Sequence, residues 1–254
     1  MGHARENDAV APVVLEVKDL TVHHGQLCAV DDVSFSVRQG EVLTIIGANG
    51  AGKSTLMRTI AGLHAQSSGS ILFQDEDVSK IAPHRRFARG ISLVPEGRRL
   101  FPSLTLEENL LVGATKGAKG VFTLEAIYDT FAWMRDRRRA HVWQFSGGEQ
   151  QAVAIGRALI ANPKLILLDE VSLGLAPIVI ERIYEVIPRI VAQGVTVLIV
   201  EQDVSQGLKV ADRVHCLLEG RTSLVGAPGE LSDEQIERAY FGASLHDTSS
   251  HGDA

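Results

Sequence analysis

The chain has 254 residues, of which 45% are hydrophobic and 22% are charged. This size and balance suit one large globular domain or two small ones, and they exclude a disordered or fibrous chain. Lys and Arg number 25 against 31 Asp and Glu, and the net charge of -6 disfavours a nucleic-acid partner. All apolar runs are far shorter than the roughly 18 residues of a spanning helix, so we expect no membrane span.

The N-terminal segment carries acids where a signal peptide would be apolar, which predicts that the protein stays on the cytoplasmic side. We expect an extension at 1–12, one domain at 13–243 and a flexible tail without periodicity at 244–254. Cys28 and Cys216 lie far apart without CxxC spacing. They predict buried thiols rather than a disulfide or a metal site.

Alternating apolar and polar side chains at 14–23 and 31–37 predict half-buried antiparallel strands. From Glu41 a short apolar run, a glycine-rich loop and an apolar pattern of helical spacing predict strand, loop and helix. Further short strands, separated by helical stretches, are expected at 90–94, 165–168, 195–200 and 213–218. This alternation is typical of an α/β fold with a parallel-sheet core.

The strand pattern disappears between Phe101 and Ile160. Helical segments are expected there around 107–113, 124–137 and 147–160. We therefore predict a helical subdomain, at about residues 100–160, inserted in the α/β core.

Residues 47–54 read GANGAGKS and fit the phosphate-loop pattern GxxxxGK[ST], after a strand and before a helix. Its glycines allow backbone conformations that a Cβ forbids, so that successive N–H groups can converge on phosphate oxygens. Lys53 and the helix N-terminus would neutralise the β- and γ-phosphates of ATP, and Ser54 would give a hydroxyl to Mg²⁺. An ordinary glycine-rich turn is the alternative. The predicted nucleotide-binding residues of this loop are Gly47, Ala48, Asn49, Gly50, Ala51, Gly52, Lys53, Ser54 and Thr55.

The apolar run 165–168 ends in Asp169 and Glu170, at the sheet edge where open α/β sheets bind ligands. Asp169 would hold Mg²⁺, and Glu170 would orient and deprotonate the attacking water. A lone acid pair more often begins a surface loop. The phosphate loop reverses that preference, because a metal and a triphosphate nearby give a reason for two adjacent like charges.

Residues 146–151 read SGGEQQ and lead into a helical pattern. Ser146 lies 23 positions before Asp169. Two glycines that open a helix expose its N–H groups to an anion, although Ser146 and Glu149 could also form a plain capping box. Both can be true.

With the phosphate loop and the acid pair, this segment resembles the signature motif of ABC-type ATPases. The resemblance runs from about Val14 to about Gly242. It implies a P-loop fold with an N-terminal antiparallel β subdomain and an inserted helical subdomain. It also implies that the signature contacts ATP held by the opposite subunit, so that each chain carries half of a composite site. The residues concerned are Ser146, Gly147, Gly148 and Gln150.

Four further segments resemble the ATP-binding subunits of importers for branched-chain and other hydrophobic amino acids, whose relatives also handle urea and short amides. They are VPEGRRLF at 94–101, TLEENLLVGA at 105–114, SLGLAP at 172–177 and VEQD at 200–203. This similarity implies ATP-driven uptake at the cytoplasmic face of the inner membrane. The implied partners are a second ATPase subunit, identical or a paralogue, two integral membrane permease subunits and an extracytoplasmic solute-binding protein.

Several positions depart from the general pattern of the ABC family, among them Phe145, which replaces Leu before the signature. Glu96 stands in place of the usual Gln and would ligate Mg²⁺ or position water. Gln202 replaces the switch His and could donate an amide N–H to the γ-phosphate, without the charge of a His. His24 stands where an aromatic residue stacks on adenine, and a solvated loop His is an equal alternative. Val171 replaces Pro, which bears on the placement of Ser172.

The basic run RDRRR at 135–139 predicts a solvated helix face or, alternatively, a salt-sensitive contact with a partner. Trp133 and Trp143 fit either the core or a docking surface.

Two other functions compete with transport. A non-transport ABC ATPase usually brings paired cassettes or long coiled coils, and the sequence has neither a second phosphate loop nor a sustained heptad pattern. A nucleotide-binding regulator without turnover would not need Lys53, Asp169 and Glu170 together.

Overall fold

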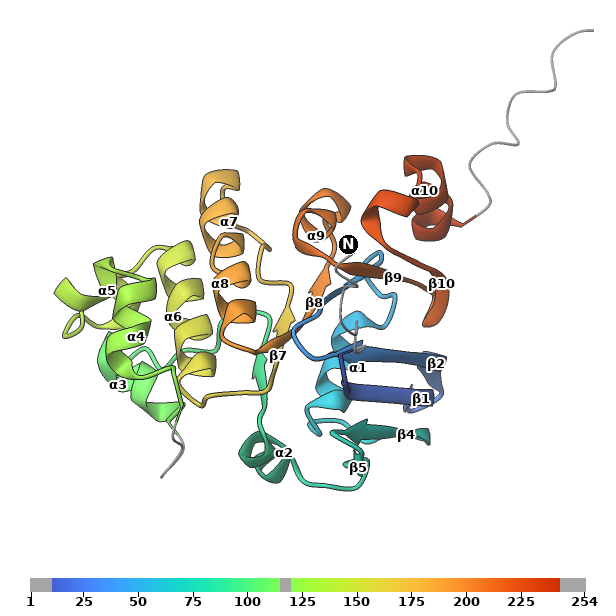
Figure 1. Ribbon diagram of the computed structural model, residues 1–254, viewed down its shortest axis with the longest axis horizontal. Helices are drawn as coiled ribbons and strands as arrows, with labels where there is room; N and C mark the ends of the chain where they lie inside the picture. Colours follow the sequence, from blue (N-terminus) through green and yellow to red (C-terminus); the bar gives the residue numbers. More distant parts are fainter. Residues whose placement is uncertain (1–10, 115–119, 243–254) are drawn as a thin grey trace, which may run out of the picture.

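The strands of the computed structural model form two sheets, and the structure describes residues 11–114 and 120–242. A smaller sheet has the strand order β2-β1-β4-β5, and a six-stranded sheet has the order β10-β9-β3-β8-β7-β6 (Figure 1). The smaller sheet consists of β1 (Val13–His24), β2 (Leu27–Arg38), β4 (Ser68–Phe73) and β5 (Glu76–Asp77). The larger one consists of β3 (Val42–Ile46), β6 (Ile91–Val94), β7 (Leu165–Asp169), β8 (Thr196–Glu201), β9 (Arg213–Leu218) and β10 (Arg221–Gly226).

The smaller sheet is antiparallel throughout, as the period-two pattern predicts. Its apolar side chains gather on one face in a core cluster that also takes side chains from α1. The sequence pattern missed β4, because SGSILF begins with three small residues and has no clear alternation.

Five neighbouring strands of the larger sheet, from β9 to β6, run parallel, and β10 returns antiparallel on β9. The two faces of β7 enter different core clusters: Leu165 and Leu167 pack toward the antiparallel sheet, while Ile166 and Leu168 pack toward the helical side. Both faces of a parallel sheet are covered in this way, which explains why its strands read as continuous apolar runs. The predicted α/β fold class with an antiparallel N-terminal subdomain is confirmed.

Helices cover both faces of the large sheet and form one end of the molecule (Figure 1). They are α1 (Lys53–Ile60), α2 (Pro83–Arg89), α3 (Leu106–Val112), α4 (Leu124–Thr130), α5 (Trp133–Asp136), α6 (Gly147–Leu159), α7 (Pro177–Tyr184), α8 (Ile187–Ala192), α9 (Val204–Val210) and α10 (Asp233–Phe241). Short 3₁₀ turns lie at Val142–Gln144 and Pro228–Glu230. Among the described residues between β6 and β7, no strand of either sheet occurs, and α3 to α6 lie together at that end.

The single helix expected over 124–137 is wrong, because the structure divides it into α4 and α5. Phe131 leaves the helical conformation with φ of -123° and ψ of 73°. The break lets both Phe131 and Met134 point into the core, where they are 7% and 0% exposed.

The two cysteines are free, but only Cys216 is buried, whereas Cys28 is partly exposed. Burial of both thiols was expected, so that prediction is half right. Within 11–114 and 120–242, no helix combines the length and the apolar character needed to cross a bilayer.

The sheet order brings the carboxyl ends of β3, β8, β7 and β6 side by side. In open parallel sheets, ligands bind at this edge. The segments that leave these four strands carry the phosphate loop, Gln202, the Asp169–Glu170 pair and Glu96, respectively.

Candidate active site

The phosphate loop joins β3 to α1, and its glycines are needed for two different reasons. Gly52 has φ of 94°, and a Cβ there would lie 2.1 Å from the carbonyl oxygen of Ala29. Gly47 does not have positive φ, but a Cβ at this position would lie 2.4 Å from the carbonyl oxygen of Leu217. The expected conformational freedom therefore applies at Gly50 and Gly52, whereas Gly47 is required by close packing.

The beginning of α1 leaves backbone donors available to a phosphate. The amide N–H groups of Gly52, Lys53 and Ser54 donate no hydrogen bond to any of the described residues. The first amide of α1 that does is that of Leu56, which donates to the carbonyl of Gly52 at 2.9 Å. The first N–H groups of a helix cannot be satisfied within it, and together with the helix dipole they attract an anion. This geometry fits the predicted phosphate cradle.

Lys53 is 3% exposed, and its ammonium lies within the loop. Its Nζ donates to the carbonyls of Gly47 at 2.8 Å and Ala48 at 3.1 Å. The same atom lies 3.1 Å from Oε1 of Glu170. The ammonium thus links the phosphate loop to the acid pair at the end of β7.

Asp169 is fully buried at the end of β7 and accepts a hydrogen bond on Oδ1 from Oγ of Ser54 at 2.9 Å. Its Oδ2 is buried without a partner among the described residues. Burial raises the pKa of this carboxyl, the bond from Ser54 lowers it, and the charge of Glu170 raises it again. A hydroxyl beside a carboxylate with an oxygen to spare is a donor set that suits Mg²⁺, so these residues fit the predicted metal.

Glu170 has φ of 48°, in the left-handed region that costs a non-glycine residue about 1–2 kcal/mol. Its backbone N–H donates to the carbonyl of Val200 at 3.0 Å, and its carboxylate is 9% exposed. The structure therefore holds Glu170 in a strained position beside Lys53. That position supports a role at the reaction centre, where such strain is concentrated.

The two variant positions lie at the same sheet edge. Glu96 follows β6 and is partly buried. Its charge helps to raise the pKa of the Asp169 carboxyl, with a smaller effect than burial or the charge of Glu170. Gln202 follows β8, and its carbonyl accepts a hydrogen bond from Oη of Tyr240 at 3.2 Å. Gln202 also lines a cavity between α9 and α10. The proposed γ-phosphate contact of Gln202 remains a prediction.

His24 lies beside the phosphate loop, at the end of β1. Its Nε2 is 3.1 Å from Oγ1 of Thr55, and its ring lies 4.3 Å from that of His64. The side chain is exposed. This position is compatible with a base stacked near α1, and the stacking itself remains a prediction.

The signature segment begins α6, where Ser146 and Glu149 form the expected capping box. Oγ of Ser146 accepts from the amide of Glu149, and Oε2 of Glu149 accepts from the amide of Ser146. Gly148 packs against Val179 of α7. The Gln150 amide group donates to two carbonyls of the preceding turn, so in this structure it is held within its own subdomain.

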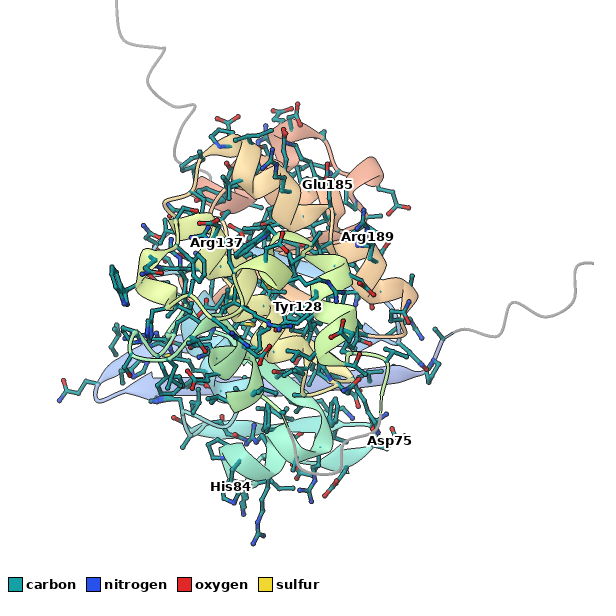
Figure 2. All side chains as sticks on the ribbon, turned by 90° about the vertical axis from the view of Figure 1, so that its left-hand side faces the viewer. Asp75, His84, Tyr128, Arg137, Glu185 and Arg189 are labelled. Atoms are coloured by element: carbon teal, nitrogen blue, oxygen red, sulfur yellow. The ribbon has the colours of Figure 1, made fainter. Side chains whose placement is uncertain are left out.

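The basic run and its neighbours lie on the helical end of the molecule, which faces the viewer in Figure 2 with Tyr128 and Arg137 labelled. Arg135 pairs with Glu125 at 2.5 Å and Asp129 at 2.8 Å, and Arg137 pairs with Glu149 at 2.5 Å. These pairs within the chain favour a solvated surface over a partner contact, but the expected helix covers only Arg135 and Asp136 of the run, because α5 ends at Asp136. Trp133 packs edge-on against Phe145, whereas Trp143 is 65% exposed.

Sequence reasoning missed Glu201, the last residue of β8. It is 1% exposed and lies next to the segment that follows Glu170. Its signal was available: an acid ends an apolar strand directly before Gln202, just as Asp169 ends β7.

Comparisons with known proteins agree with this geometry. Residues 30–172 match the family described as ABC transporter. The chain is 42% identical over 233 residues to the high-affinity branched-chain amino acid transport ATP-binding protein BraG of Pseudomonas aeruginosa, covering 90% of this chain and 100% of BraG. It is 32% identical over 243 residues to the lipopolysaccharide export system ATP-binding protein LptB of Escherichia coli, covering 90% of this chain and 97% of LptB. The structure of the ADP conformation of MJ1267, an ATP-binding cassette of an ABC transporter, superposes with a TM-score of 0.76 at 27% identity, covering 90% of this chain and 94% of that one.

Proposed function

Because the chain belongs to the ABC transporter family, whose cassettes are ATPases coupled to transport, we propose that it energises uptake of branched-chain or other hydrophobic amino acids. The higher identity to BraG than to LptB, over nearly the same share of the chain, supports this class of solute. A related urea or amide importer is the second candidate, because the resemblance of residues 94–101, 105–114, 172–177 and 200–203 extends to these relatives as well.

The proposed reaction is attack of water on the γ-phosphate of ATP. The amide groups at the start of α1 and the ammonium of Lys53 would bind the phosphates and stabilise the charge that develops on them. The carboxylate of Glu170 would accept the proton of the attacking water. Ser54 and Asp169, with Glu96 nearby, would hold Mg²⁺, which when bound neutralises phosphate oxygens.

The proposed partners are a second ATPase subunit, two membrane permease subunits and an extracytoplasmic solute-binding protein. The chain would then lie at the cytoplasmic face of the inner membrane as a peripheral subunit. The membership of a transporter family and the similarity to BraG support this assembly.

The observation that carries the proposed reaction is a pair of adjacent contacts between the phosphate loop and the end of β7: Ser54 donates to Asp169, and Lys53 forms an ion pair with Glu170. The test is steady-state ATP turnover of Glu170→Gln, which keeps the shape but removes the base. We expect turnover to fall by at least about 100-fold, because a general base contributes that much. ATP binding, measured on the same protein, should persist.

A parent-like rate in Glu170→Gln would show that Glu170 is not the base. Glu230→Gln is a matched control, because this exposed glutamate of the 3₁₀ turn Pro228–Glu230 belongs to neither the phosphate loop nor the signature segment. Its turnover should equal that of the parent.

The solute is tested by uptake of labelled leucine and labelled urea into cells that lack this chain and carry either the parent or Glu170→Gln. Leucine uptake that requires the parent supports the amino-acid proposal. Uptake of urea alone supports the second candidate. Restoration of neither solute contradicts both.

A further inference from the structure

The backbone around Glu170 must be held against its own preference, since this residue has φ of 48°. Such a conformation persists only where neighbouring groups fix it. On its N-terminal side, the amide of Glu170 donates to the carbonyl of Val200 in β8 at 3.0 Å. On its C-terminal side, the carbonyl of Glu170 accepts from the amide of Leu173 at 3.3 Å within the turn, and the first contact with another element is made by Ser172.

Ser172 is bound by the carboxylate of Glu201, the residue that follows Val200 in β8. Oε2 of Glu201 accepts from the hydroxyl of Ser172 at 2.5 Å, and Oε1 accepts from its amide at 3.3 Å. Oε1 also accepts from Oη of Tyr184, at the end of α7, at 2.5 Å. Three donors thus bind the carboxylate at the end of β8: two from Ser172 in the turn after β7 and one from Tyr184 of α7.

This arrangement is costly for a side chain that is 1% exposed. No Lys or Arg of the described residues forms an ion pair with Glu201, and burial raises the pKa of its carboxyl. A buried acid without a cationic partner is costly even where it is hydrogen-bonded, so a hydrophobic residue would serve packing better at this position. The cost therefore points to a use for the hydrogen bonds themselves.

We propose that Glu201 is a positioning residue. By binding Ser172, it holds Glu170 where this carboxylate can accept the proton of the water that attacks the γ-phosphate. Two consecutive residues of β8 then accept hydrogen bonds from the segment that carries the base. The carbonyl of Val200 accepts from the amide of Glu170, and the carboxylate of Glu201 accepts from Ser172. Val171, between these two hydrogen-bonded residues, is 1% exposed and lacks the fixed φ of proline. The hydrogen bonds therefore restrain the backbone of this segment. This inference rests on the proposed role of Glu170.

The test compares kcat, the dissociation constant of ATP and the thermal unfolding midpoint in the full chain. Glu201→Ala removes all three acceptor bonds, and we expect kcat to fall by about tenfold or more, because small misplacements of a reacting group have effects of this size. The dissociation constant of ATP should stay within about twofold, since the three side-chain hydrogen bonds of Glu201 go to Ser172 and Tyr184, outside the phosphate loop.

Rescue and coupling separate positioning from a purely structural role. Glu201→Gln can accept from the Ser172 amide and donate to its hydroxyl, so kcat should return to within about threefold of the parent. In a Ser172→Ala background, Glu201→Ala should reduce kcat by a smaller factor than in the parent, because one shared bond is already lost. If Glu201→Ala does not fold, Ser172→Ala alone should lower kcat with unchanged ATP affinity.

Thr44→Val is the matched control, since Thr44 is a buried polar residue of β3 whose hydroxyl has no partner among the described residues. It should leave kcat unchanged. A parent-like kcat in both Glu201→Ala and Ser172→Ala, or a loss explained by the unfolded fraction alone, would overturn the proposal. If instead Glu170→Gln retains turnover, the proposed function falls and this inference falls with it.

Discussion

Position 148, in the signature segment, requires glycine because of the space around it rather than because of its backbone conformation. A Cβ at this position would lie 2.1 Å from Cγ1 of Val179, a branched side chain that has little freedom to move. We expect Gly148→Ala to lower the free energy of unfolding by about 1–3 kcal/mol, the usual cost of overpacking. Urea denaturation of the purified chain measures this change.

A second substitution and a control isolate the clash. Val179→Ala in the Gly148→Ala background removes the clashing methyl groups, so the double variant should lose less stability than the two single changes added together. Gly229→Ala places a Cβ where no atom lies within 4 Å, and its effect should be close to zero. Additive losses in the double variant would contradict a direct contact.

Among the elements, β9 carries a buried histidine that makes stability depend on pH. His215 is 1% exposed, with Nε2 2.8 Å from Oγ1 of Thr222. Burial, and then the charge of Arg213, lowers its pKa from 6.5 to about 4. The unfolded chain therefore binds a proton between these values while the folded chain does not, so stability is complete above about pH 6.5 and is lost as the pH falls toward 4.

From this group alone we expect the free energy of unfolding to be about 2 kcal/mol lower at pH 5 than at pH 7.5. Urea denaturation of the parent and of His215→Gln at both pH values checks it, because contributions of all other groups cancel in the comparison. The parent should lose more stability than the variant on acidification. Equal losses would show that His215 does not remain neutral in the folded chain.

The elements also show which features the sequence predicts and which it does not. The sequence predicts β7 from its continuous apolar run, because this strand is buried on both faces. It predicts β1 from its alternation, because that strand is buried mainly on one face. The break at Phe131 was not, because local helical spacing continues through it and only the tertiary core decides that both Phe131 and Met134 turn inward. Contacts between distant segments, such as Glu201 with Ser172, depend on strand order, which no local pattern encodes.

For the whole molecule, the geometry of one chain supports a site completed by another. The two candidate anion-binding helix starts belong to α1 and α6, which lie on opposite sides of β7 and β8 in Figure 1. The signature glycines contact Arg98, Leu175 and Val179, while the phosphate loop contacts Ala29 and Leu217. This separation supports the proposed second ATPase subunit, whose signature would reach the phosphate loop of this chain.

A complementation experiment tests this arrangement. Lys53→Ala and Ser146→Arg should each abolish turnover, the latter with ATP binding retained by the isolated subunit. Where the second ATPase subunit is another copy of this chain, a mixed pair of the two variants keeps one phosphate loop and one signature intact across the same interface. An equimolar mixture should then regain turnover, at most about a quarter of the parent if pairing is random and sites act independently. Ser232→Arg, which breaks the matching capping box of α10, controls for loss of a helix cap and should remain active. Loss of ATP binding in Ser146→Arg would instead place the signature in the site of its own chain, because only then would the substitution meet the nucleotide without a partner.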